Sequence, residues 1–406
     1  MAENIKASVR EHPVSALSNV RIVEIAEGVS GEYCGKLLAD FGAEIIKVER
    51  PGSGSPTRHL GPFAGAGADP ERSGLFAYLN TNKHSVTLDL ESAPGREALA
   101  RLAGHADVVL DDHAPGWLAG VGLDPERVPA LYPGLILCGI TPFGWDAPPE
   151  RAHAEDMTVI HASGWGYHTP SGGSDDRPPL SGAGRFLPSY EAGLEAALCV
   201  TASLLGRDET GRGQVIDISM QAVMASRVDY VLGQMIAGDM DVGTSRAQFD
   251  LGGPAGIFPA RSGFIYLWMS APAHWEAIRA LLGDPDWMRA FPPDWLERGL
   301  TPERIALSRR HIGAWLKTQD KDEAAAAAQG LGLTLVPVND ASDLLRSPQF
   351  RHRGFFRPVE HPAQGEALYP TVSYKLSATP ARIERPAPLL GQHDEAMLAT
   401  FMGAAA

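Results

Sequence analysis

Residues 20–50, "VRIVEIAEGVSGEYCGKLLADFGAEIIKVER", contain a predicted strand, helix and second strand in that order. Residues 20–27 form a short apolar run that ends at Gly28, which is typical of a buried strand. Residues 31–42 place apolar side chains at helical spacing, and residues 43–50 form a second apolar run. A helix between two such strands predicts a parallel pair joined by a crossover connection.

The same alternation continues through the first half of the chain. Residues 84–90 and 107–112 predict strands, and residues 91–106 between them predict a helix with Ser92 as its N-cap. Residues 134–144 predict a further buried strand. Repeated alternation of strands and helices favours an α/β fold built on a parallel sheet.

The middle of the chain is more helical. Residues 157–165 and 190–205 predict helices on either side of a loop rich in Gly, Ser and Pro. Residues 211–220 predict a strand, followed by a helix that runs to Met235. Apolar periodicity is lost between residues 240 and 254, which predicts a domain boundary there.

The pattern of the last third of the chain indicates a second domain beyond the predicted boundary. With 406 residues the chain exceeds what one compact core usually holds, so we expect two domains. Residues 333–406 are strand-like and rich in Pro. Beyond the boundary the pattern predicts one strand at 263–270 and helices at 274–283, 301–317 and 321–330.

Composition excludes several classes of partner. The formal charge of −14 makes nucleic acid an unsuitable general partner. The first eighteen residues lack an apolar core of the kind that a signal peptide needs, and no apolar run reaches 18 residues, so we expect no membrane association. The three cysteines are far apart, which fits a reducing cytoplasm.

Common cofactor and catalytic motifs are absent from the sequence. It has no Walker phosphate loop, dinucleotide fingerprint, zinc-protease helix or hydrolase elbow. The Gly-rich residues 51–56, "PGSGSP", open no helix and predict a turn. The thirteen histidines are scattered and the cysteines have no zinc spacing, so we expect no metal site.

Five segments resemble, in the same order, signatures of the family III CoA-transferases. This family includes formyl-CoA transferase, carnitine CoA-transferase and α-methylacyl-CoA racemase. Residues 20–58 are similar to the opening of the family, and the resemblance covers nearly the whole chain. The later matches are "NTNKHSVTLDL" (80–90), "ADVVLDDHAPGWLAGVG" (106–122), "TGRGQVIDISM" (210–220) and "APLLGQHDEAML" (387–398).

The resemblance implies a fold and a class of substrate. It implies a large Rossmann-like α/β domain formed by residues 16–240 with 340–406, which binds CoA, and a smaller α+β domain at 250–335. It further implies an interlocked dimer. The substrates would be an acyl-CoA and a small carboxylic acid, with coenzyme A a substrate and no cofactor tightly bound.

Ser189 stands where the resemblance implies the catalytic aspartate. That aspartate attacks the acyl-CoA thioester to form a mixed anhydride, which CoA thiolate converts to an enzyme thioester. A carboxylate is ionised at neutral pH and leaves readily from an anhydride, whereas an un-ionised hydroxyl forms only an ester. The alignment of residues 178–197, "PPLSGAGRFLPSYEAGLEAA", makes this assignment.

Other carboxylates are alternatives for this role. Glu191 lies two residues beyond Ser189, which turns its side chain by roughly 200° around a helix. Asp175 and Asp176 precede Ser189 in the loop. Glu155 matches a glutamate of some family transferases and the catalytic histidine of the racemase. The structural alternatives are that Ser189 caps a helix beginning at Tyr190, and that Glu155 is a solvated residue in a first helical turn.

The resemblance implies CoA contacts at Gly28, Val29 and Ser30, at Arg50 near the nucleotide, and at Leu88 near the adenine. Two further positions differ from the family. Asp112 replaces an asparagine and brings a negative charge toward an anionic ligand, and Gly120 replaces an arginine. The family's glycine-rich loop is reduced to residues 252–253.

These residues leave four hypotheses for the function of the chain. The chain is an acyl-CoA enzyme that uses Glu155, Glu191 or Ser189 as catalytic groups, or it is the aspartate-lacking subunit of a heteromeric transferase. The further alternatives are a racemase or isomerase with a non-standard pocket, and a non-catalytic CoA-binding subunit.

Overall fold

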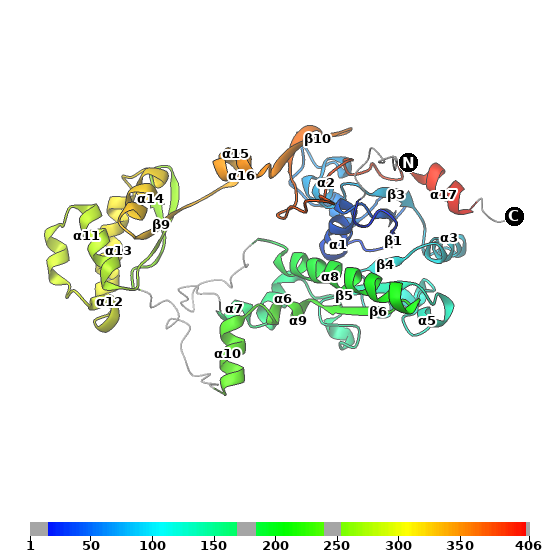
Figure 1. Cartoon of the computed structure of the whole chain (residues 1–406), viewed down its shortest axis with the longest axis horizontal. Helices are drawn as coiled ribbons and strands as arrows, with labels where there is room; N and C mark the ends of the chain where they lie inside the picture. The colour runs from blue at the N-terminus through cyan, green and yellow to red at the C-terminus, as the bar shows by residue number, and fades with distance from the viewer. Residues whose placement is uncertain (1–14, 169–183, 239–252, 403–406) are drawn as a thin grey trace, which may run out of the picture. The chain divides into compact units, whose positions relative to one another are not determined.

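The structure is a computed structural model that describes residues 15–168, 184–238 and 253–402 (Figure 1). The described residues fall into two compact units. One lies within Met1–Gly166, Ser181–Gly233 and Gly354–Ala406, and the other lies within Tyr167–Leu180 and Gln234–Arg353.

A six-stranded parallel sheet forms the centre of the first unit, which confirms the predicted α/β class. Its strand order is β3-β2-β1-β4-β5-β6, so the order reverses between β1 and β4. In sheets of this kind ligands bind outside the carboxyl ends of the strands at the point of reversal. The strands are β1 (Arg21–Glu24), β2 (Glu44–Glu49), β3 (His84–Thr87), β4 (Val108–Asp111), β5 (Ile136–Thr141) and β6 (Val215–Ser219).

Helices cover both faces of this sheet, because successive strand residues point to opposite sides. Ile22 and Val108 belong to one core cluster, beneath α1 (Val29–Asp40) and α8 (Leu187–Thr210). The alternate strand residues belong to a second cluster with α3 (Ala93–Gly104). Among the described residues, the remaining α-helices that lie wholly in this unit are α2 (Gly74–Leu79), α4 (Trp117–Gly120), α5 (Val128–Leu131), α6 (Asp156–Ala162), α9 (Met220–Ala225) and α17 (Asp394–Met402).

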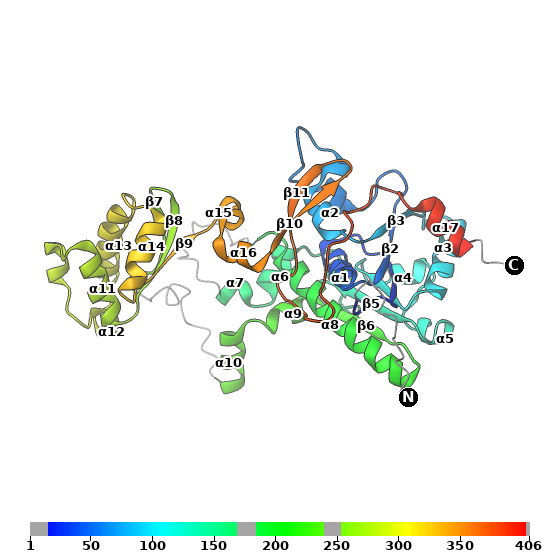
Figure 2. The same ribbon diagram turned by 45° about the horizontal axis from the view of Figure 1, so that its top comes forward.

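The C-terminal segment completes the first unit. Asp394 begins α17 and accepts hydrogen bonds from the backbone N–H of Thr87 at 2.6 Å and from its hydroxyl at 2.7 Å. Helix α17 lies beside α3 in Figure 1. A hairpin of β10 (Phe356–His361) and β11 (Gly365–Pro370) packs on α2, as Figure 2 shows.

The second unit contains a three-stranded antiparallel sheet in the order β7-β8-β9. The strands are β7 (Gly256–Ala260), β8 (Gly263–Trp268) and β9 (Thr334–Val338). Its aromatic core includes Trp275 and Trp295, whose rings meet edge to face. The helices are α11 (Pro272–Leu282), α12 (Trp295–Arg298), α13 (Pro302–Leu316), α14 (Lys321–Gly330), α15 (Ala341–Arg346) and α16 (Pro348–Arg353).

Three of the predicted helical or strand-like stretches were wrong in detail. The helix expected at 157–165 ends at Ala162, before Gly164 takes a positive φ of 84°, and α7 (Trp165–His168) is separate. The helix expected to run to Met235 is two helices, α9 and α10 (Asp229–Ala237). The C-terminal stretch contains helices as well as strands. Most of the predicted boundary at 240–254 lies outside the described residues.

Candidate active site

A cleft of about 680 Å³ opens beside the carboxyl ends of β1 to β4, next to the point where the strand order reverses. Its volume is in the range of small-molecule sites. Arg50, Leu88 and Gly120, which the sequence singled out, line this cleft together with residues that the sequence did not single out. Those additional residues include Glu27, Arg96, His113 and Trp117.

Two of the basic side chains in the cleft, Arg50 and His113, contact Glu27. The guanidinium of Arg50 donates to both carboxylate oxygens of Glu27, at 2.8 and 2.6 Å. His113 lies 3.4 Å from Glu27 through Nε2 and 2.7 Å from Asp111 through Nδ1. Burial alone would lower the pKa of His113, but hydrogen bonds to Asp111 and Glu27 raise it to about 9. Burial opposes ionisation of Glu27, but His113 and Arg50 lower its pKa.

An aromatic surface lies beside these charges. The indole of Trp117 stacks on the imidazole of His113, with ring centroids 3.6 Å apart and planes 5° from parallel. The side chain of Arg50 is 63% exposed, so it can reach a ligand in the cleft. A flat aromatic pair beside the exposed guanidinium of Arg50 suits a ligand that combines a planar base with phosphates.

The carboxylate of Asp112 caps the N-terminus of α1. It accepts hydrogen bonds from the backbone N–H groups of Glu27, Gly28 and Gly31 at 2.8, 3.0 and 3.1 Å, and from the hydroxyl of Ser30 at 3.2 Å. A Cβ atom on Gly28 would lie 2.8 Å from this carboxylate, so glycine permits the approach. These amides are the groups that bind phosphate at helix N-termini, and here an internal carboxylate already satisfies them.

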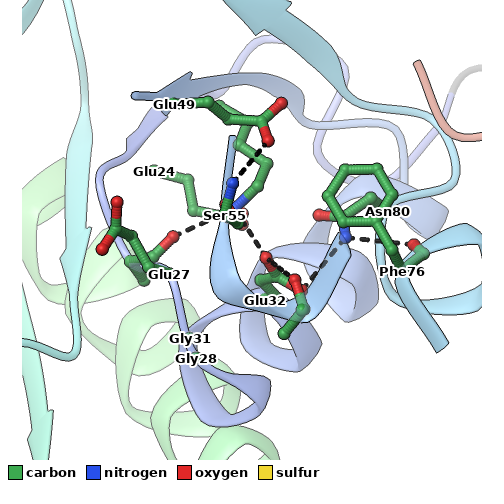
Figure 3. Close-up of polar contacts among 12 residues, drawn as sticks. Glu24, Glu27, Gly28, Gly31, Glu32, Glu49, Ser55, Phe76 and Asn80 are labelled. Carbon is green, nitrogen blue, oxygen red and sulfur yellow. Dashed lines mark hydrogen bonds and ion pairs between the residues drawn. The ribbon is translucent and has the colours of Figure 1, made fainter. Parts of the chain in front are cut away.

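A buried ion network joins β1, β2 and α1, and the sequence indicates it only through charged residues within apolar strands (Figure 3). Lys47 contacts Glu24 at 3.1 Å and Glu32 at 2.9 Å, and Lys83 contacts Glu24 at 2.8 Å. All four side chains are fully buried. Removing one partner from such a pair leaves an uncompensated buried charge, so the network strongly constrains β1, β2 and α1.

Glu49 links this network to the cleft wall. The guanidinium of Arg58 donates to both of its carboxylate oxygens at 2.7 and 2.9 Å, and the backbone N–H of Ser55 donates at 3.0 Å (Figure 3). Burial opposes its ionisation, but Arg58 and Lys47 lower the pKa of Glu49 to about 2. The carboxylate is therefore a fixed negative charge and not an acid or base at neutral pH.

Ser189 is the third residue of α8, and Phe186 is the N-cap residue of this helix. The expectation that Ser189 caps a helix beginning at Tyr190 was therefore wrong. The physical reason is that Pro188 fits in the first turn, so the helix begins earlier. Ser189 instead contacts Asp156, the first residue of α6, through two hydrogen bonds. Its backbone N–H donates to Oδ1 at 2.9 Å and its hydroxyl donates to Oδ2 at 2.9 Å.

Asp156 was not among the residues that the sequence predicted. It is partly buried, and burial raises its pKa, partly offset by the two hydrogen bonds from Ser189. Its neighbour Glu155 occupies the N-cap position of α6 with an exposed side chain that makes no capping hydrogen bond. Glu191 forms an ion pair with Arg227 at 3.2 Å, on a different side of α8 from Ser189.

Of the three predicted catalytic residues, Ser189 is the one that hydrogen-bonds to a carboxylate among the described residues, and that carboxylate belongs to Asp156. The predicted alternatives Asp175 and Asp176 lie outside the described residues, as does Gly252. The signal that could have found Asp156 is its position beside Glu155 at a helix start, but the pattern does not show which of two adjacent carboxylates faces α8.

The helix that contains Ser189 packs against the turn for which the family resemblance implies a CoA contact. Gly193 is one helical turn beyond Ser189 on the same face of α8. A Cβ atom on Gly193 would lie 2.5 Å from the carbonyl oxygen of Ser30, so α8 and α1 approach closely there. The rings of Tyr190 and Tyr33 also meet edge to face, with centroids 4.7 Å apart. The start of α8 therefore packs against the start of α1.

The part of the chain that the structure describes contains free cysteines and no cluster of metal-ligating side chains. Within those residues, no group of three or more His, Cys, Asp or Glu side chains could hold a metal ion. The three cysteines are free, and burial raises the pKa of each thiol. A raised pKa disfavours the nucleophilic thiolate at neutral pH. None of the described helices is both long and apolar enough to cross a membrane.

Comparison with known proteins gives a consistent assignment. The model of CoA-transferase family III matches residues 17–394. The chain is 31% identical to the succinyl-CoA–D-citramalate CoA-transferase of Chloroflexus aurantiacus, over 97% of this chain and 96% of that protein. It is 30% identical to the formyl-CoA:oxalate CoA-transferase of a Bradyrhizobium species, over 96% of this chain and 94% of that protein.

Solved structures show the same fold. A CAIB/BAIF family protein from Brucella suis superimposes with a TM-score of 0.77 at 26% identity, covering 95% of this chain and 99% of that chain. The Rv3272 protein of Mycobacterium tuberculosis superimposes with a TM-score of 0.72 at 24% identity, covering 95% of this chain and 99% of that chain.

Proposed function

The chain belongs to CoA-transferase family III, and from this premise we propose that it transfers coenzyme A from an acyl-CoA to a small carboxylic acid. The observation that carries the proposal is the cleft where the strand order reverses, with Arg50 and Leu88 in its wall. Coenzyme A is a substrate in this scheme and no resident cofactor is needed. The donor and acceptor acids are small, and the cytoplasm is the proposed location.

The nucleotide end of CoA is proposed to occupy the cleft. Arg50 and the cationic His113 suit its phosphates, and Leu88 and Trp117 suit its adenine ring. The backbone amides around Gly28 are capped by Asp112, so this turn offers packing contacts and no phosphate site. We propose that CoA passes along Gly28, Val29 and Ser30 toward the start of α8, past the carboxylate of Asp112.

A second candidate function rests on Ser189 itself. A hydroxyl at this position favours the aspartate-lacking subunit of a heteromeric transferase, whose related partner supplies the carboxylate. Three exposed leucines on α8 support a partner subunit, because Leu194, Leu198 and Leu205 are 47, 62 and 68% exposed. Their spacing places them along one helix face. That partner is proposed to be a related chain, because a second copy would also carry Ser189. If the chain instead works alone, we propose an interlocked dimer of two copies. In either case residues 16–240 with 340–406 are proposed as the large CoA-binding domain and 250–335 as the small one.

The test begins with the chain purified alone. Titration calorimetry with CoA is expected to detect binding, and the chain is expected to form a new thioester from succinyl-CoA or formyl-CoA with D-citramalate, glutarate or oxalate. If the chain binds CoA but catalyses no turnover alone, and a co-transcribed related chain restores turnover, the result would favour the heteromeric-subunit hypothesis. Absence of CoA binding in both preparations would refute a CoA-transferase function.

A further inference from the structure

Two hydrogen bonds from Ser189 fix the orientation of the Asp156 carboxylate. Its Oδ1 accepts a hydrogen bond from the backbone N–H of Ser189 at 2.9 Å, and its Oδ2 accepts one from the hydroxyl of Ser189 at 2.9 Å. A carboxylate has about four lone-pair sites, so acceptor capacity remains beyond these two bonds and the bond from the backbone N–H of Asp156 itself. The two bonds fix the plane of the carboxylate while leaving lone pairs for another group.

The alternatives near Ser189 are less suitable among the described residues. Glu191 is held by Arg227, which also contacts Glu195 at 2.8 Å. Glu155 is exposed and makes no capping contact. The hydroxyl of Ser189 donates a hydrogen bond to Asp156 and could form only an ester with an acyl group. Asp156 is the described carboxylate that directly contacts the residue at the family's nucleophile position.

We propose that Asp156 is the nucleophile that carries CoA during transfer, in place of an aspartate at position 189. This inference rests on the proposed CoA-transferase function and identifies the group that performs it. It assigns Ser189 to positioning: its hydroxyl and N–H orient the Asp156 carboxylate. The chain then needs no partner subunit to supply an aspartate.

The reaction follows with all atoms accounted for. An oxygen of Asp156 attacks the acyl-CoA carbonyl carbon, the C–S bond breaks, and CoA thiolate leaves a mixed anhydride. The thiolate attacks the Asp156 carbonyl carbon, the donor carboxylate departs, and an aspartyl-CoA thioester remains. The acceptor carboxylate then displaces CoA to form a second anhydride. The thiolate attacks the acceptor acyl carbon, which releases the new acyl-CoA and restores the Asp156 carboxylate.

Ser189 also stabilises the negative charge of the tetrahedral intermediates that form when the Asp156 carbonyl carbon is attacked. When thiolate attacks the Asp156 carbonyl carbon, negative charge develops on the oxygen that faces the backbone N–H of Ser189. A fixed donor at 2.9 Å from that oxygen stabilises the charge without reorganisation. The hydroxyl can rotate away from the other oxygen when that oxygen becomes bonded to an acyl group. Burial raises the pKa of Asp156, which makes the ionised carboxylate a better nucleophile than a solvated one.

The location also suits the expected path of CoA. Glu27 lines the cleft, and Gly28 to Ser30 follow it directly in sequence. Ser30 meets α8 at Gly193, one turn from Ser189, which contacts Asp156. The contacts therefore connect the proposed nucleotide cleft to the Asp156 carboxylate through residues of one compact unit.

The test traps the adduct and maps it. The chain is incubated with succinyl-CoA, treated with borohydride or hydroxylamine, digested and sequenced by mass spectrometry. The modification is expected at Asp156, and Asp156→Asn is expected to abolish it and to lower kcat by at least about a thousandfold. Asn keeps the shape of the side chain and an acceptor for the Ser189 N–H, so thermal unfolding is expected to stay cooperative. Glu150→Gln, which removes an exposed carboxylate from the preceding segment, is the control and is expected to retain the adduct.

Separate readouts distinguish the two proposals. Calorimetry is expected to give the same CoA affinity for the wild type and Asp156→Asn within about twofold, because the nucleotide cleft is unchanged. An adduct mapped to Glu155, Glu191, Asp175 or Asp176 would overturn the Asp156 assignment and leave CoA transfer intact. Trapping only on an aspartate of a related partner chain would also overturn it. Absence of CoA binding by the wild type would overturn both proposals.

Discussion

The carboxylate of Asp156 accepts two hydrogen bonds from Ser189, although the two residues are 33 positions apart and lie in the first turns of different helices. This contact changes the meaning of a serine at the position where family resemblance implies an aspartate. A carboxylate is still present at the start of α8, although position 189 is a serine. The serine holds a carboxylate that comes from the start of α6.

Arg50 is expected to contribute to CoA affinity, and Glu27 is expected to reduce it. Arg50→Ala removes a charged hydrogen-bond donor and is expected to weaken CoA binding by about 1–3 kcal/mol, or about 5- to 150-fold in Kd. Glu27→Gln removes a negative charge from the cleft and releases Arg50, which is expected to tighten binding by about 1.5- to 5-fold. Calorimetry at fixed ionic strength measures both effects. An unchanged Kd in Arg50→Ala would remove Arg50 from the site.

Gly35 is expected to be required by the buried ion network. A Cβ atom there would lie 1.8 Å from a carboxylate oxygen of Glu24, which pairs with Lys83 and Lys47. Gly35→Ala is expected to lower the free energy of unfolding by about 3–5 kcal/mol, because it forces the buried pairs apart. The matched control is Gly104→Ala at the end of α3, where the nearest atom would be 3.9 Å away.

The control substitution is expected to raise the free energy of unfolding by about 0.5–1 kcal/mol, since alanine suits a helix better than glycine. Urea denaturation of the two variants measures both values. Equal effects at the two positions would contradict the role assigned to the Glu24 network.

His113 is expected to stabilise the fold in a pH-dependent way. Asp111, Glu27 and Asp112 face it, and its pKa rises from the ordinary 6.5 to about 9 in the folded chain. A raised folded pKa means that the stabilisation is fully present below the unfolded pKa and is lost as pH rises through about 9. His113→Gln is therefore expected to cost up to about 3 kcal/mol near pH 6 and progressively less above pH 9.

Denaturant titrations of wild type and His113→Gln across this pH range measure the difference directly. Other groups titrate in both proteins, so the difference isolates His113. A difference that grows with rising pH would show that the imidazole is neutral in the folded chain.

Much of the fold was predictable because its elements are local. The alternation around residues 20–50 predicts the parallel sheet, and Ser92 caps α3 as expected, accepting from the N–H of Gly95 at 3.1 Å. Arg50 and Leu88 were placed by resemblance and lie in one cleft. These features depend on short-range spacing, or on segments whose order along the chain is itself informative.

The contacts that decide the chemistry could not be predicted in the same way. Periodicity places Lys47 in an apolar strand but does not reveal that Glu24 and Glu32 neutralise it. Asp112 was expected to oppose an anionic ligand, whereas its main partners are the amides of α1. Asp156 faces Ser189 only because α6 and α8 meet in space, which no spacing within either helix specifies.

Isotope transfer tests the assignment of Asp156 most directly. The chain is allowed to turn over acyl-CoA with an acceptor acid whose carboxylate carries oxygen-18, and trypsin then cleaves after Arg151, Arg185 and Arg207. When CoA attacks the acceptor acyl carbon of the last anhydride, the bridging oxygen stays on the enzyme carboxylate. The account predicts one oxygen-18 in the peptide that begins after Arg151, located at Asp156 by fragmentation. Turnover with the label at Glu155, in the peptide that contains Glu191, or in no peptide would contradict it.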